Sequence, residues 1–539
     1  MRTNLSLLLF APALVLIGAV NSAAAAASPA PGVYANGSDR AVAGVYDRRA
    51  ADWRNGAVVY QVLVDRFAPS DHLDEKRALY PAPKVLRRWD QLPTRGTYLP
   101  EVKVWSHEID FWGGDLRSVR GKLRYIDDLG ADVLYLNPIH LAWTNHKYDA
   151  LDYKALSPEF GTRADLDALI VDAHGHGLKV VLDGVFNHVG RNAPLFQAAS
   201  AGPSAPNRDW FVWGPQYPGG ARIWRDAQNL VELNLENPAV REYVWGAPDS
   251  VVQGYLAEGI DGWRLDVAYD IGFRYLAELT EAAHKRKPGS LVVGEIANYP
   301  REWFPSVDGV MDFTLRQVIL GIALGQIDAP SGNRMIERII GDAGIEPMLK
   351  SWMMLDNHDT ERLATSVPDP ARRRLAQVLQ FTLPGSPNVY YGSEVGMSGG
   401  TDPAMRAPMR WDLVVPGNAT LSWTRGLIAL HQSHRALRVG DFRRVESSRL
   451  VAFERFTDRI EDAVVVLANP GSDVVTETVL VPDSKLMNDV SMIDLLDPAA
   501  AAVPIHSATL RITLQPGEVR VLAPDVVAKA GYSPYKRVQ

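Results

Sequence analysis

The stretch GIDGWRLDV at residues 259–267 decides how this 539-residue chain is expected to fold. It is a short, largely apolar run bounded by glycine, which is the pattern of a buried strand. Successive side chains of a strand point to opposite faces. Arg264 and Asp266 therefore share one face, while Trp263 and Leu265 turn toward flanking helices. The stretch predicts a buried strand with charged groups at its carboxyl end.

Seven further runs of this kind occur between residues 55 and 395, separated by stretches of helical periodicity. Such alternation is typical of a parallel α/β protein. Gly130 is expected to end the helix over 116–129, and Thr162 to cap the next one. The eight expected strands are residues 57–65, 131–136, 179–183, 260–266, 291–295, 310–313, 352–356 and 388–391. They predict an α/β fold, a (β/α)8 TIM barrel.

Changes of sequence texture outline the other parts of the chain. The long connection after the third strand has no helical period, and such connections tend to be functional. Short alternating strands at 451–456, 463–467, 475–481 and 508–522, the last broken near Pro516 and Gly517, predict a C-terminal antiparallel β-sandwich. The expected organisation is a signal peptide at 1–27, an N-terminal linker at 28–54, the barrel at 55–436 with an insertion at 187–238, the β-sandwich at 437–525 and a tail at 526–539.

The first residues have the pattern of a targeting signal. Arg2 precedes the apolar stretch 5–20, and the small residues 23–27 offer a cleavage site. A membrane anchor is the alternative, but a spanning helix needs about 20 apolar residues, and this stretch is shorter and contains Pro12. We expect an exported protein, periplasmic or secreted, that begins near Ala27 or Ser28 and does not associate with a membrane after cleavage.

Composition excludes several classes of function. The net charge of −7 is spread along the chain without a basic stripe, so we expect no nucleic-acid partner. The chain has no cysteine, which excludes disulfides and thiolate metal sites. We also expect no organic cofactor.

Ionisable residues gather where four of the strands end. The third strand leads into Asp183, Asn187 and His188, the fourth into Arg264 and Asp266, the fifth into Glu295, and the seventh into His358 and Asp359. Strand ends of this kind form the active site of a (β/α)8 barrel. One such acid alone could be a structural cap, but this combination indicates catalysis. A guanidinium beside Asp266 favours its ionised form, which suits a nucleophile, and Glu295 after an apolar run suits a proton donor.

These residues lie in four ordered motifs, DGVFNH, GWRLDVA, GEI and DNHD, which resemble those of the α-amylase superfamily of glycoside hydrolases, family 13. The resemblance implies that Asp266 is the nucleophile, Glu295 the general acid/base and Asp359 the stabiliser of the transition state. It also implies that the reacting glucose is held by further residues, and that the insertion is the family's domain B. Those residues are Asp183, Asn187, His188, Arg264 and His358, with Tyr148 of NHKYD stacking under the sugar.

Within the superfamily, LNPIHLAWTNHKYDALDY, RDWF and LVELN are most similar to the neopullulanase, cyclomaltodextrinase and maltogenic amylase group. The resemblance implies a retaining glycoside hydrolase that cleaves α-1,4-glucosidic bonds in starch-derived glucans, maltooligosaccharides or cyclodextrins, and the targeting signal predicts that this enzyme is exported. A transglycosylase or an exo-acting α-glucosidase of the same superfamily would share fold and carboxylates. An inactive glucan-binding relative is a third alternative, disfavoured because all three carboxylates are present.

Two further expectations concern ligands. The loop DRFAPSDHLD at 65–74 resembles a calcium loop, with Asp65, Asp71, Gly114 and Asp115 as ligands. The alternative is that Asp71 and Asp74 are solvated turn residues. Tryptophans concentrate in the loops expected on the catalytic side, and they could stack on sugars or simply anchor loops. They are Trp105, Trp112, Trp143, Trp210, Trp213 and Trp224. Trp143, close to Tyr148 in sequence, is the best candidate for a sugar contact.

Overall fold

The computed structural model describes residues 40–527. The predicted signal peptide, the first part of the predicted linker and the tail from residue 528 lie outside the described residues.

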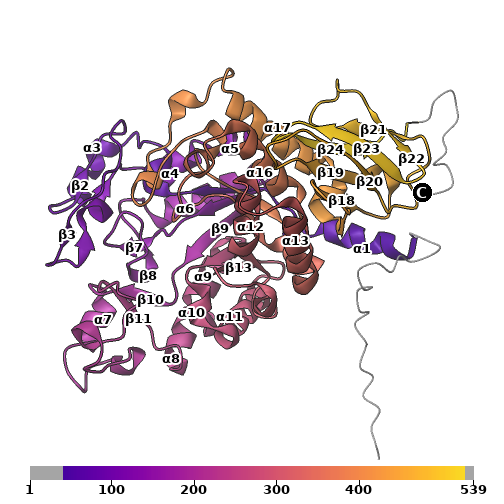
Figure 1. The fold of residues 1–539 in the computed structure, drawn as a ribbon. Coiled ribbons are helices and arrows are strands. Elements are labelled where there is room, and N and C mark those ends of the chain that lie inside the picture. The colour runs from indigo at the N-terminus through magenta and orange to yellow at the C-terminus, as the bar shows by residue number, and fades with distance from the viewer. Residues whose placement is uncertain (1–39, 528–539) are drawn as a thin grey trace, which may run out of the picture. The chain divides into compact units, whose positions relative to one another are not determined.

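Eight parallel strands close into the expected barrel (Figure 1). Around the barrel the order is β1, β16, β15, β14, β13, β12, β9 and β6. Barrel strands that follow one another along the chain are therefore neighbours in the sheet. The strands are β1 (Val59–Val62), β6 (Val133–Leu136), β9 (Lys179–Gly184), β12 (Gly262–Leu265), β13 (Leu291–Ile296), β14 (Gly309–Asp312), β15 (Trp352–Met354) and β16 (Ser386–Tyr390). The predicted TIM barrel is thereby confirmed.

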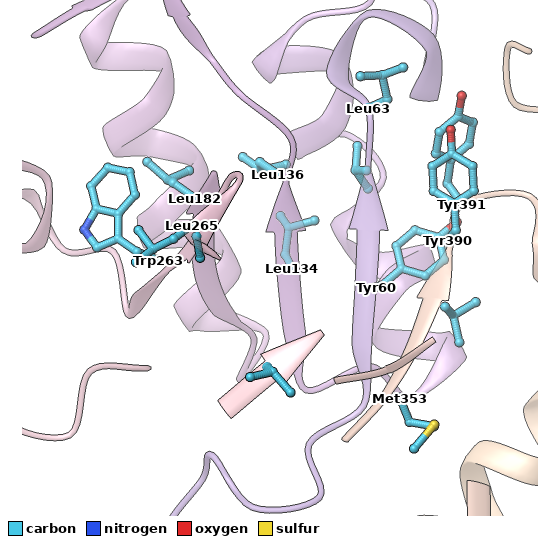
Figure 2. Packing of buried hydrophobic residues seen from close by; sticks show 14 of the residues in the cluster. Tyr60, Leu63, Leu134, Leu136, Leu182, Trp263, Leu265, Met353, Tyr390 and Tyr391 are labelled. Atoms are coloured by element: carbon cyan, nitrogen blue, oxygen red, sulfur yellow. The ribbon is translucent and has the colours of Figure 1, made fainter. Parts of the chain in front are cut away.

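Alternating side chains of the strands form two apolar layers. Val133 and Tyr135 of β6 pack inside the barrel with residues from other strands. Leu134 and Leu136 face outward with Trp263 of β12, in one cluster with apolar residues of the surrounding helices (Figure 2). Burial on both faces explains why the strands are nearly continuous apolar runs.

Helices cover the barrel. The helix expected over 116–129 is interrupted at Gly121 into α4 and α5, and Gly130 ends it with a φ of 95°. Thr162 caps α6 by accepting a hydrogen bond from the Asp165 N–H, as predicted. The principal barrel helices are α4 (Leu116–Arg120), α5 (Leu123–Leu129), α6 (Arg163–Gly175), α9 (Val251–Glu258), α11 (Phe273–Arg286), α12 (Phe313–Ala323), α13 (Ala329–Ala343), α16 (Pro370–Thr382) and α17 (Ala419–Ser433). Within residues 40–527 no helix is long and apolar enough to cross a membrane.

The two longest excursions from the barrel leave the carboxyl ends of β9 and β1. Between β9 and α9, strands β10 (His188–Gly190) and β11 (Leu230–Glu232) pair antiparallel beside helix α7 (Pro194–Ala199). This is the segment predicted as domain B, and we keep that name for residues 187–238. The second excursion follows β1, which ends three residues earlier than expected because residues 64–67 form helix α2. It contains α3 (Leu73–Lys76), β2 (Val85–Leu86), β3 (Tyr98–Leu99), β4 (Val104–Trp105) and β5 (Asp110–Phe111).

The C-terminal part is an antiparallel sheet curled around its own core. Five strands match the expected ones, with β23 and β24 together corresponding to the expected run 508–522. Strands β17, β21 and β22 were not expected because they are short and carry charged or poorly alternating residues. The strands are β17 (Asp441–Arg444), β18 (Val451–Phe456), β19 (Val464–Ala468), β20 (Val475–Leu480), β21 (Ser491–Asp494), β22 (Val503–His506), β23 (Thr509–Leu514) and β24 (Val519–Pro524).

Part of the expected linker is helical. Residues 40–51 form α1 (Arg40–Ala51), and Arg49 pairs with Glu346 at 2.7 Å and Asp441 at 2.9 Å. Ion pairs between residues so distant in sequence hold this helix, and local periodicity could not have indicated them.

Candidate active site

Arg264 is the centre of the site. Its guanidinium is fully buried at the end of β12, and Nη1 lies 2.8 Å from Asp183 Oδ1 and 3.0 Å from Asp266 Oδ1. Nη2 lies 2.9 Å from Glu295 Oε2. One cation therefore joins carboxylates from three adjacent strands, β9, β12 and β13, and fixes their relative positions.

The two proposed catalytic acids are also joined through the backbone. Val267 follows Asp266 in a left-handed conformation, with a φ of 47°, which is unusual for a β-branched residue. This turn directs the Val267 N–H to Glu295 Oε2 at 3.0 Å. The strained residue thus positions the side chain of the proposed proton donor.

The protonation of Asp266 differs from the sequence expectation. Burial raises the pKa of Asp266 well above its usual value; Arg264 opposes this shift, whereas the carboxylates of Glu295 and Asp183 add to it. The Arg264 guanidinium was expected to keep Asp266 ionised, but it is shared among three carboxylates. A site with this excess of carboxyls favours retention of one proton among them, whereas attack by Asp266 requires that Asp266 itself be ionised.

Tyr148 and His358 form one wall of the site. Their rings are parallel within 3°, with centroids 5.2 Å apart, and the Tyr148 hydroxyl lies 2.6 Å from His358 Nε2 and 2.8 Å from Asp183 Oδ2. Gln61 and Asn137, at the ends of β1 and β6, contact His358 Nδ1 at 2.9 and 3.3 Å. Sequence analysis missed these two amides because an uncharged side chain after a strand carries no distinctive signal.

Asp359 is held by a residue from a different loop. Arg406 follows β16, and its Nη2 donates to Asp359 Oδ1 at 2.9 Å, while its Nε donates to the His358 carbonyl at 2.7 Å. His358 and Arg406 outweigh the desolvation of Asp359 and hold its pKa below the usual range. Arg406 was also missed, since it lies in an irregular segment 47 residues from its partner.

His188 links the barrel to domain B. Its Nε2 lies 3.2 Å from the Tyr148 carbonyl, which can only accept, so Nε2 carries the proton and Nδ1 can accept from Asn187. Burial lowers the pKa of His188 to about 4, which keeps it neutral. The Trp224 ring of domain B stacks on it with centroids 5.8 Å apart.

Domain B is bridged to the segment after Asp266. Trp224 Nε1 donates to Asp270 Oδ2 at 3.0 Å, and Arg225 Nη2 donates to the Tyr269 hydroxyl at 2.7 Å. Asp270 and Tyr269 lie in helix α10 (Ala268–Ile271). The bridge therefore flanks the site on the side of Asp266 and Glu295.

The other tryptophans mostly anchor loops. Trp112 donates to the Gln91 carbonyl and Trp213 to the Arg208 carbonyl, and Trp210 packs against Tyr243. Trp143 packs on a small cluster around Phe111 and Val104. Trp105 differs, because 39% of its surface is exposed.

The four residues expected to bind calcium do not form a ligand set for that ion. Asp65 is fully buried, and its carboxylate accepts from the N–H groups of Trp112 and Gly113. Asp115 caps α4 and pairs with Lys76, whose Nζ also donates to the Gly113 carbonyl at 3.0 Å.

An ammonium thus lies beside Gly114, where the expectation placed a metal ion, and Asp71 is exposed to solvent. Among residues 40–527, no group of three or more His, Cys, Asp or Glu side chains could hold a metal. Calcium binding stays an untested prediction. The four residues, as they are arranged here, do not fit a calcium ion.

Comparison with known proteins agrees with this geometry. The family model "Alpha amylase, catalytic domain" matches residues 61–462. The chain is 30% identical over 489 residues to neopullulanase 2 of Thermoactinomyces vulgaris, covering 87% of this chain and 78% of that protein. It is 32% identical over 435 residues to a cyclomaltodextrinase of Bacillus sp, covering 77% and 73%.

Solved structures show the same relationship. The ligand-free cyclic α-maltosyl-(1→6)-maltose hydrolase of Arthrobacter globiformis matches with a TM-score of 0.73 at 29% identity, covering 88% of this chain and 99% of that one. A cyclomaltodextrinase structure matches with a TM-score of 0.74 at 27% identity, covering 88% and 79%. The matched range of the family model contains Asp266, Glu295 and Asp359, and the chain belongs to the α-amylase family as a retaining glycoside hydrolase.

Proposed function

We propose that this enzyme hydrolyses α-1,4-glucosidic bonds in starch-derived glucans, maltooligosaccharides or cyclodextrins. The observation that carries the proposal is the clamp by which Arg264 holds Asp183, Asp266 and Glu295 together. This arrangement supports a mechanism in which Asp266 and Glu295 act on one sugar, with Asp359 as the third acid of the same site.

In the first step Asp266 attacks the anomeric carbon while Glu295 gives its proton to the departing glycosidic oxygen. The bond to the leaving sugar breaks, and a covalent ester to Asp266 forms. In the second step Glu295 takes a proton from water, the water oxygen attacks the same carbon, and the ester bond breaks. Asp359, kept ionised by His358 and Arg406, stabilises the positive charge that develops in each step.

The substrate class is supported by similarity. Similar proteins are named for the hydrolysis of pullulan and cyclomaltodextrin, and one matching structure is a complex with maltose. Tyr148 supports it from the geometry, because its half-buried ring faces the site beside His358 and offers a flat surface to a sugar.

Product analysis tests the proposal. Soluble starch, maltotriose, pullulan and β-cyclodextrin are each incubated with the enzyme, and products are separated by chromatography. We expect maltooligosaccharides to be shortened, with Asp266→Asn as the inactive control. Intact maltooligosaccharides, with consumption of sucrose or trehalose instead, would show that the substrate assignment is wrong.

We also propose export to the periplasm or medium, with cleavage after the alanines at 23–27. Similarity does not support it, since one relative at 31% identity is named an intracellular maltogenic amylase. Mass spectrometry of the protein from each cell fraction tests this proposal. Exported protein that begins near Ala27 is expected; Met1 retained in membrane-bound protein would identify an anchor instead.

A further inference from the structure

A short hairpin rises from the connection between β1 and α4 (Figure 1). Its strands β3 and β4 pair antiparallel, with Tyr98 opposite Trp105 and Leu99 opposite Val104. Because side chains alternate along a strand, these two pairs occupy opposite faces of the hairpin.

The two faces differ in their surroundings. Val104 is buried in a small cluster with Phe111 and Ile109, and Leu99 and Trp143 pack against that cluster. Tyr98 and Trp105 are each 39% exposed. Trp143 therefore packs against the buried face of the hairpin, and Tyr98 and Trp105 are the exposed aromatic side chains of its other face.

The exposed pair is held in a defined arrangement. The two rings meet edge to face with centroids 5.7 Å apart, and Arg95 lies 5.7 Å from the Trp105 centroid. The backbone next to them is fixed by a hydrogen bond from Thr97 N–H to Ser106 Oγ at 3.1 Å. Gly96 is required there, because a Cβ would lie 2.1 Å from Ser106 Oγ. Tyr and Trp combine a large apolar surface with a polar group and are enriched at interaction surfaces.

The base of the hairpin is tied to the loops of the active site. Asn145, three residues before Tyr148, donates to the His107 carbonyl at 2.8 Å. His107 Nδ1 accepts from the Gly96 N–H, so its Nε2 carries the proton and donates to Asp402 at 2.9 Å.

Asp402 in turn pairs at 3.3 Å with Arg406, the residue that holds Asp359. The hairpin base thus rests on the wall of the site that contains Tyr148 and Asp359.

The tip of the hairpin approaches domain B. Lys103 Nζ lies 3.5 Å from Gln228 Oε1. Trp105 is therefore located between the point where the hairpin meets domain B and the point where His107 meets the loop after β16. All of these contacts are made on the catalytic face of the barrel.

The direction of the substrate follows from the proton donor. Glu295 must lie next to the oxygen of the leaving group, so the leaving portion occupies the side of Glu295, α10 and Trp224. The base of the hairpin is tied through His107 and Asp402 to the other wall, where the portion that stays on the enzyme is held, while its tip at Lys103 contacts domain B. That portion extends toward the non-reducing end of a glucan.

We propose that Tyr98 and Trp105 bind glucose units on the non-reducing side of the reacting sugar, beyond the unit that contacts Tyr148. The inference rests on the proposed action on α-glucans. The apolar faces of glucose rings can pack on the two aromatic rings while their hydroxyls remain in water. The hairpin would thus make the enzyme prefer longer chains.

The test follows release of 4-nitrophenol from 4-nitrophenyl α-glucoside and from 4-nitrophenyl α-maltopentaoside, because for this cleavage the two substrates share a leaving group and differ only in non-reducing units. The measured quantity is the ratio of kcat/KM for the long substrate to that for the short one. We expect Trp105→Ala to lower this ratio about three- to tenfold, and Tyr98→Ala to lower it by less. Trp105→Phe should restore most of the ratio.

The matched control is Leu92→Ala. Leu92 belongs to the same excursion and is 69% exposed, but it lies outside the hairpin. Its substitution should leave the ratio at the wild-type value. A Trp105→Ala variant that lowers kcat/KM equally for both substrates, or for neither, would overturn the inference.

A binding measurement separates the inference from the proposed function. Maltoheptaose is titrated calorimetrically into Asp266→Asn and into the double variant Asp266→Asn/Trp105→Ala, both checked for unchanged Tm. We expect about three- to tenfold weaker binding to the double variant.

If the wild type hydrolyses no α-glucoside, the proposed function fails, and the hairpin is judged on this titration alone. Equal affinity of the two proteins, or no binding to either, would overturn the hairpin's role.

Discussion

Arg406 Nη2 lies 2.9 Å from Asp359 Oδ1, so a residue that no sequence motif indicated holds one of the three proposed catalytic acids. The same guanidinium donates to the His358 carbonyl and pairs with Asp402. Asp359 is thereby held by the segment after β16, and its pKa is lowered by His358 and Arg406.

Loss of this contact should change both rate and pH dependence. We expect Arg406→Met to lower kcat by roughly 10- to 1000-fold, because an ionised Asp359 in the correct position stabilises the transition state. Since Arg406 lowers the pKa of Asp359, its removal should move the acid limb of the kcat/KM profile to higher pH.

Arg406→Lys should recover part of both effects. The control is Arg410→Met, whose guanidinium is 54% exposed and pairs with Asp412. If Arg406→Met lowers kcat but leaves the acid limb in place, the role assigned to its charge is wrong.

Asp266 and Asp359 should have opposite effects on stability. The pKa of Asp266 is raised in the folded protein, so the stability associated with its proton is complete below pH 3.8 and is lost as the pH rises. Asp266→Asn should therefore raise Tm at pH 7, by about 1 to 3 °C, and this gain should shrink toward pH 4.

For Asp359, whose pKa is lowered, stability is present above pH 3.8 and is lost at lower pH. Asp359→Asn should lower Tm at pH 7 and have less effect in acid. Thermal melting curves of the three proteins between pH 4 and 8 measure both trends. Shifts of equal sign for the two variants would contradict the assigned protonation states.

The parts predicted from the sequence are those whose signal is local. Apolar runs indicated the barrel strands, and the charged residues at their ends, Asp183, Asp266 and Glu295, indicated the catalytic face of the barrel. Both signals are local, because a parallel strand buried on both faces can carry charge only near its end. Arg406 and Gln61 left no such signal, since their roles depend on loops that meet only in the folded chain. The hairpin at 98–105 was missed because its paired segments are two residues each.

Lys76 provides the test of the calcium prediction. Its ammonium is 13% exposed and pairs with Asp115, so Lys76→Met should destabilise the fold by about 1 to 3 kcal/mol. If this ammonium serves in place of a metal ion, a chelator should leave the wild-type Tm unchanged. A bound calcium ion would instead raise Tm by mass action. A fall in Tm on chelation, reversed by added calcium, would establish a calcium site and contradict the structural role given to Lys76.

The roles of the two catalytic carboxyls can be separated by the choice of leaving group. Glu295→Gln removes the proton donor, so it should lower kcat on maltooligosaccharides by several orders of magnitude. With 2,4-dinitrophenyl α-maltoside, whose leaving group needs no proton, it should still form the ester to Asp266 and accumulate it, because no base activates water. Mass spectrometry detects the ester, and added azide should restore turnover by giving the α-glycosyl azide.

Asp266→Asn should form no ester and gain nothing from azide. In the wild type, two displacements at one carbon retain its configuration, so NMR of the first products should show new reducing ends in the α form. Initial release of the β form would rule out the covalent route through Asp266, and with it the roles assigned to both carboxyls.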